Sequence, residues 1–198
     1  MGGRKIRNVT KRDVLSLTAS IYDPLGFVSP CVVVLKILFQ KLCEDKSDWD
    51  TVLSGDLKEE WDLWCQSAER AGELKIDRHY FRSNGEIRSV ELIGLSDASE
   101  KAYAAVVYAR ADVAGEPACQ TSLIGSKTRV APLKKQTIPR LELLGAFILS
   151  RLMKRIYEII GTEFCINDVT CCIDSVIAFG WIQHVDIELI QSCKYLQC

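Results

Sequence analysis

Three acidic residues lie where the cleavage of a phosphodiester by metal ions would need them. Asp97 ends an apolar, strand-like run over residues 90–97, and Asp174 ends a second one over residues 169–174. Glu142 lies in the first turn of a strongly apolar, helix-like run. Two hard cations need clustered carboxylate oxygens, and strand ends beside a helix start can supply them. We therefore predict that Asp97, Glu142 and Asp174 converge on one pocket that holds Mg²⁺, with Mn²⁺ as a substitute.

Each of these acids also has an ordinary structural explanation. Asp97 could belong to a turn, and Asp174 could cap the helix that follows it. Glu142 is harder to explain in this way, because its helical neighbours Gly145 and Ala146 form a small, apolar face suited to close packing on a sheet. An ionised carboxylate on such a face is costly unless it is paired or bound to a metal ion. Together, the three acids favour the metal site over three unrelated structural roles.

A basic stretch next to the predicted site points to a polyanionic substrate. Residues 117–141 contain no Asp or Glu, and they include five cations: Lys127, Arg129, Lys134, Lys135 and Arg140. These side chains could follow the phosphates of a nucleic acid, or they could simply belong to a solvated loop. Phosphate contacts position a protein without reading a base sequence, so no sequence specificity is expected.

The bulk composition restricts the class of protein. The chain has 198 residues, 48% of them apolar, and a formal net charge of −1, so any nucleic-acid contact must be local. Nine cysteines without a C-x-x-C pair, and only two histidines, argue against a zinc site and favour reduced thiols. No signal peptide or apolar stretch long enough for a bilayer is visible, so the expected location is cytoplasmic, without a membrane partner.

Hydrophobic periodicity predicts a helical first part and an α/β second part. Helices are expected over residues 13–22, from Ser29 (as N-cap, with Pro30 at the first helical position) to about Leu42, and from Asp56 onwards. In the last of these, Trp61 and Trp64 lie on one packing face. Strands and helices are then expected in the order strand 87–97, strand 103–110, strand 121–128, helix 137–160, strand 169–174 and helix 175–183. This order predicts an α/β layer fold with a mixed sheet, and we place the domain boundary between residues 1–84 and 85–198.

Several motifs in this order resemble the region after the polymerase palm in BEL/Pao-type retrotransposon polyproteins. They are RDVLS (12–16), YDPLGFVSP (22–30), LSDASEKAY (95–103), SKTRVAPL (126–133), IPRLEL (138–143), IDS (173–175) and GWI (180–182). The resemblance implies the tail of a reverse transcriptase followed by a ribonuclease H-like domain. It further implies that Asp97, Glu142 and Asp174 are catalytic, that the substrate is an RNA–DNA hybrid, and that the rest of the reverse transcriptase is a partner.

One departure from that pattern bears on activity. The family pattern has a fourth acid well downstream, and here only Asp186 and Glu188 follow Asp174, neither a convincing substitute. We therefore expect a C-terminally truncated domain with weak or no nuclease activity. Two alternatives stay open: a non-catalytic nucleic-acid-binding or spacer domain, and a retrotransposon aspartic peptidase. A peptidase needs Asp-Thr/Ser-Gly, and neither Asp97-Ala98-Ser99 nor Asp174-Ser175-Val176 has the glycine.

Overall fold

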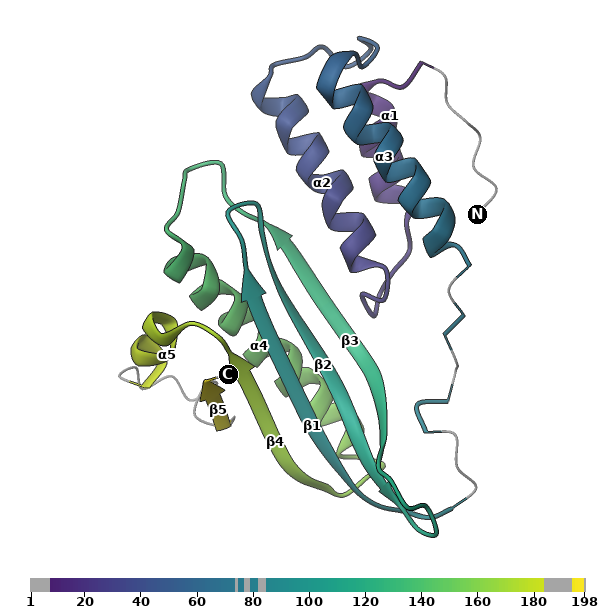
Figure 1. Ribbon diagram of the computed structural model, residues 1–198, viewed down its shortest axis with the longest axis vertical. Helices are drawn as coiled ribbons and strands as arrows, with labels where there is room; N and C mark the ends of the chain where they lie inside the picture. Colours follow the sequence, from purple (N-terminus) through teal and green to yellow (C-terminus); the bar gives the residue numbers. More distant parts are fainter. Residues whose placement is uncertain (1–7, 74, 77–78, 82–84, 184–193, 198) are drawn as a thin grey trace. The chain divides into compact units, whose positions relative to one another are not determined.

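The chain divides into two compact units, Met1–Ile76 and Asp77–Cys198, called here the helical unit and the sheet unit. The computed structural model describes residues 8–73, 75–76, 79–81, 85–183 and 194–197 (Figure 1). The division falls after Ile76, whereas the sequence places the boundary after residue 84. The change of composition near residue 85 marks the approach to the first strand, and the packing of the helical unit ends earlier.

Three helices form the helical unit: α1 (Lys11–Ser20), α2 (Ser29–Glu44) and α3 (Gly55–Ala71). Their apolar faces share one core, formed by Val9, Val14, Leu35, Leu38, Leu42, Leu53 and Trp61. Trp61 is only 3% exposed, and the indole N–H of Trp64 donates to the carbonyl oxygen of Cys31 at 2.9 Å. The three predicted helices are confirmed, and both tryptophans of α3 have structural partners.

The start of α2 differs from the prediction in its cap. Val28 occupies the N-cap position without a side-chain hydrogen bond, and Ser29 is the first helical residue. The carboxylate of Asp23 instead accepts the backbone N–H groups of Phe27 and Val28, both at 2.9 Å. Gly26 has a φ of 81°, as expected for the turn that precedes the helix. An aspartate upstream therefore satisfies backbone donors ahead of the helix.

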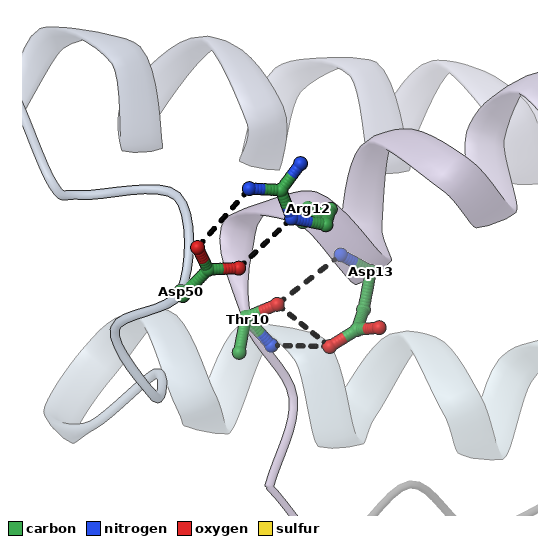
Figure 2. Close-up of polar contacts among 4 residues, drawn as sticks. All are labelled: Thr10, Arg12, Asp13 and Asp50. Atoms are coloured by element: carbon green, nitrogen blue, oxygen red, sulfur yellow. Dashed lines mark hydrogen bonds and ion pairs between the residues drawn. The ribbon is translucent and has the colours of Figure 1, made fainter.

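Residues at the start of α1 cap this helix and tie it to the loop between α2 and α3. Thr10 and Asp13 form a capping box, in which the Asp13 carboxylate accepts the N–H of Thr10 at 2.9 Å (Figure 2). Arg12 binds Asp50 through two hydrogen bonds of 2.8 and 3.0 Å. The guanidinium carbon of Arg12 lies 5.9 Å from the centre of the Trp49 ring. These contacts begin the helix at Lys11, two residues earlier than the sequence predicts.

The sheet unit contains a five-stranded mixed sheet. Its elements are β1 (Ile87–Ala98), β2 (Ala102–Val113), β3 (Gln120–Val130), α4 (Ile138–Ile160), β4 (Ile166–Ile173), α5 (Val176–Gln183) and β5 (Lys194–Gln197). The strand order is β3-β2-β1-β4-β5, with β1–β2 and β2–β3 antiparallel and β1–β4 and β4–β5 parallel. The predicted α/β class and mixed sheet are confirmed. The short strand β5 is an addition, because four residues carry no usable periodicity.

The long helix α4 packs along one face of this sheet (Figure 1). Leu141, Leu149, Met153 and Ile156 of α4 share a core with alternate residues of β1 and β2. A Cβ atom at Gly94 would lie 2.7 Å from both Leu149 Cδ1 and Met153 Cε. The missing side chain at Gly94 therefore lets these large residues reach the strand.

No helix among the described residues is long and apolar enough to cross a bilayer.

Candidate functional site

Two of the three predicted acids lie at neighbouring strand ends. Strands β1 and β4 run parallel, and their last register pair is Ser96 with Ile173. Asp97 is the next residue of β1, Asp174 directly follows the end of β4, and both are exposed. The carboxyl ends of parallel strands meet at the same edge of a sheet, which is the arrangement that the sequence predicts.

Glu142 reaches this region from α4. It is the fifth residue of the helix, because α4 begins at Ile138, so it opens the second turn and not the first as predicted. Its half-buried carboxylate accepts a hydrogen bond of 2.5 Å from the hydroxyl of Ser175. Ser175 is 8% exposed, and its oxygen also accepts the N–H of Ala178 at 3.1 Å. Ser175 therefore caps α5, as predicted, and also links α5 to α4 directly after Asp174.

A glycine lets α4 approach the ends of β1 and β2 closely. A Cβ atom at Gly145 would lie 3.4 Å from the carbonyl oxygen of Asp97 and 3.6 Å from both Ala104 O and Ser96 Cβ. The hydroxyl of Ser96 is buried at this contact and has no hydrogen-bond partner among the described residues. Gly145 lies three residues after Glu142, so the same helical face that carries Glu142 rests on the strand ends.

The side chain of Asp97 lies on the other side of the sheet from α4. Ser96 contacts the α4 face and Ala98 packs against its core, so the alternation of strand side chains turns Asp97 away. Its Oδ1 accepts the N–H of Ala98 at 2.6 Å. Over the described residues, no three His, Cys, Asp or Glu side chains lie close enough to hold a metal ion. The carboxylate oxygens of Asp97, Glu142 and Asp174 are ligands that a hard cation prefers, but the three side chains do not surround a single point. Their assignment as metal ligands stays a prediction.

The five predicted nucleic-acid-binding cations are all exposed. Lys127 and Arg129 on β3 pair in register with Ala105 and Tyr103, which places them on the α4 face of the edge strand. Lys134 and Lys135 lie in the following loop, and Arg140 lies in the first turn of α4. None of the five forms an ion pair with a described residue. Exposed positive side chains therefore occur on β3, in the loop after it and at the start of α4, the helix that carries Glu142.

Two serines were not predicted to contribute to the site. Ser175 was predicted only as a helix cap, because its hydrogen bond to Glu142 joins residues 33 positions apart. Ser96 gave no signal beyond its place in the strand. The later acids Asp186 and Glu188 lie outside the residues that the structure describes.

Comparison with known proteins yields one family. The family model described as "Pao retrotransposon-like RNaseH-like domain" matches residues 10–175. No curated protein matches the chain. Two solved structures of a foamy viral protease-reverse transcriptase with double-stranded DNA are similar to 96% of this chain, at 14% and 13% identity and TM-scores of 0.36 and 0.35. The chain covers 39% and 34% of those two chains, little more than a third of their length.

Proposed function

The chain belongs to the Pao retrotransposon-like RNaseH-like domain family, and from this we propose that its sheet unit cleaves the RNA strand of RNA–DNA hybrids. One arrangement carries the proposal: Asp97 and Asp174 follow the last register pair of two parallel strands, and Ser175, the residue after Asp174, donates a hydrogen bond to Glu142. This arrangement supports the use of the three acids together in phosphodiester chemistry.

In this proposal the acids bind metal ions and the basic side chains bind the substrate. Asp97, Glu142 and Asp174 would hold Mg²⁺, or Mn²⁺ in its place, through carboxylate oxygens. When bound, the metal supplies charge stabilisation and an activated water for cleavage. Lys127, Arg129, Lys134, Lys135 and Arg140 would hold the phosphate backbone of the hybrid, and their exposure without acidic partners suits that role.

We further propose that this chain alone has weak or no activity. The support is geometric, because Asp97 points away from α4 and no three acids among the described residues lie close enough to hold a metal ion. Closing the site would require movement of the Asp97 side chain when hybrid and cations bind. We propose that the helical unit is the tail of a reverse transcriptase, and that the rest of this enzyme is the partner that completes the site.

A metal-titrated cleavage assay on a labelled RNA–DNA hybrid tests the proposal, with this chain and a reverse transcriptase polyprotein that contains it. We expect Mg²⁺-dependent cleavage by the polyprotein, little by the chain alone, and none by the polyprotein with Asp97→Asn. Because the Asp97 side chain is exposed, we expect Asp97→Asn to leave the fold intact, and its circular dichroism spectrum should match that of the parent. Full cleavage by Asp97→Asn would refute the assignment of the acids.

A second candidate function is hybrid binding without catalysis. It is favoured by the exposed cations between Lys127 and Arg140, together with the open arrangement of the acids among the described residues. Under this alternative, the polyprotein binds the hybrid with strong salt dependence, and neither Mg²⁺ nor Asp97→Asn changes the bound fraction.

The peptidase alternative fits the local backbone less well. Aspartic peptidases place each catalytic Asp in a loop whose small residues let the two catalytic loops approach each other. Here Asp97 remains within β1, and Asp174 leads directly into a helix that Ser175 caps.

A further inference from the structure

The hydroxyl of Ser175 makes two directed hydrogen bonds at once. Its proton is donated to Glu142 Oε2 at 2.5 Å, and its oxygen accepts the N–H of Ala178 at 3.1 Å. A serine hydroxyl has one proton. While Ser175 donates it in the hydrogen bond to Glu142, Ser175 cannot donate to water or to another acceptor. With Ser175 only 8% exposed, solvent competes little for either bond.

We propose that Ser175 is a positioning residue, which holds the Glu142 carboxylate in one rotamer for the cleavage reaction. This inference rests on the proposed function. A glutamate side chain has three rotatable bonds, and one firm hydrogen bond to its end removes much of that freedom. Displacement of a catalytic group by about 1 Å can cost about a hundredfold in rate, so holding the carboxylate matters for turnover.

The same hydroxyl also couples two of the predicted acids. By capping α5 it fixes the first turn of that helix, and Asp174 is the residue immediately before the cap. By binding Glu142 it fixes a side chain in the second turn of α4. The backbone that follows Asp174 and the carboxylate of Glu142 are therefore both held by one hydroxyl, although 32 positions separate the two acids in the chain.

The capping and positioning roles can be separated by substitution. A cap needs only an acceptor, and Asp, Thr and Ser all serve well at this position. Ser175→Thr keeps both the acceptor and the proton, Ser175→Asp keeps the acceptor but has no proton to donate when ionised, and Ser175→Ala loses both. Ser150→Ala is a matched control, because the buried Ser150 lies two turns beyond Glu142 on α4 and donates to Phe147 O, away from that carboxylate.

The first measurement does not depend on activity. Three-bond ¹H–¹³C couplings of Glu142, measured by NMR on the labelled 198-residue chain, report its side-chain rotamers. We expect a single rotamer in the parent, Ser175→Thr and Ser150→Ala, and averaged couplings in Ser175→Asp and Ser175→Ala. Single-rotamer couplings in both of the last two variants would overturn the proposal, whatever their activity.

The second measurement is the split between kcat and KM in the hybrid-cleaving polyprotein. We expect Ser175→Asp and Ser175→Ala to lower kcat about 10- to 100-fold with little change in KM for the hybrid, which is the usual loss when the support of a metal-binding side chain is removed. Ser175→Thr should stay within about twofold of the parent. If Ser175→Asp keeps the kcat of the parent while the couplings of Glu142 are averaged, the positioning role of Ser175 is refuted. If no protein cleaves the hybrid, the proposed function fails, and the couplings alone decide whether Ser175 holds Glu142.

Discussion

Single residues determine how charge is held in both units of the chain. In the sheet unit, Glu142 is half-buried and bound by Ser175, whereas Asp97 and Asp174 are exposed. In the helical unit, Arg12 and Asp50 form a two-point ion pair at the surface. Such exposed pairs add little to stability, yet they make it depend on pH in a way that can be measured.

The Arg12–Asp50 pair gives a prediction about acid. The hydrogen bond from Arg12, and then its charge, lower the pKa of the Asp50 carboxyl below its ordinary 3.8, against an opposing effect of burial. Because the folded-state pKa is the lower one, the stabilisation is fully present above the unfolded-state value and is lost as the pH falls through the folded-state value. The stability difference between the parent and Asp50→Asn should therefore be constant near neutral pH and shrink below 3.8.

Urea unfolding followed by tryptophan fluorescence measures this difference. Trp49, Trp61 and Trp64 lie in the helical unit, so three of the four tryptophans report on it. Arg12→Gln should reproduce the pH dependence seen with Asp50→Asn, since either change removes the same ion pair, although it also removes the contact with the Trp49 ring. A difference that persists unchanged to the lowest pH would show that the pair is not formed.

At the scale of elements, glycines control how closely α4 lies on the sheet. Gly94 faces two large side chains of α4, while Gly145 on α4 faces the backbone of β1 and β2. The two positions lie in one interface, but they leave different amounts of space for an added methyl group.

This difference predicts opposite effects of the same substitution. Gly94→Ala would bring a Cβ within 2.7 Å of Leu149 and Met153, and both side chains must shift, so we expect destabilisation by about 1–3 kcal/mol. Gly145→Ala meets its neighbours at 3.4–3.6 Å, an ordinary contact, and gains helix propensity of up to about 1 kcal/mol. Urea unfolding followed by circular dichroism should rank the proteins Gly145→Ala, parent, Gly94→Ala. Equal effects at both sites would mean that α4 is not held against β1 at these distances.

At the scale of the whole molecule, net charge conceals a local excess of positive charge. The chain has 25 Lys and Arg residues against 26 Asp and Glu, yet residues 117–141 contain no acid. A nearly neutral protein can therefore bind a polyanion through one basic stretch, with binding that weakens as the salt concentration rises.

Salt dependence tests this stretch directly. Hybrid binding measured by fluorescence anisotropy at several salt concentrations should show a steep loss of affinity. The double substitution Lys134→Gln with Lys135→Gln should reduce the logarithmic slope by about 2, because each lysine that neutralises a phosphate adds about 1 to that slope. Lys58→Gln is the control, because Lys58 pairs with Asp62 on α3 and should leave the slope unchanged. An unchanged slope in the double variant would assign these lysines to a solvated loop.

The amino-acid sequence by itself determined the order and type of most elements in both units. Helical spacing around Trp61 and Trp64 predicted α3, and alternation before Asp97 predicted β1. Within one segment, the spacing of apolar residues shows which side chains are buried and with which period. The same local patterns predicted the mixed sheet and the cap at Ser175.

Only the tertiary structure decided which side chains meet. The bond between Ser175 and Glu142, the turn of Asp97 away from α4, and the division after Ile76 all depend on packing between distant segments. A one-residue change in register turns a strand side chain to the opposite face, and periodicity does not record such shifts between partners. Neighbouring strand ends were therefore predictable, whereas the distances between their carboxylates were not.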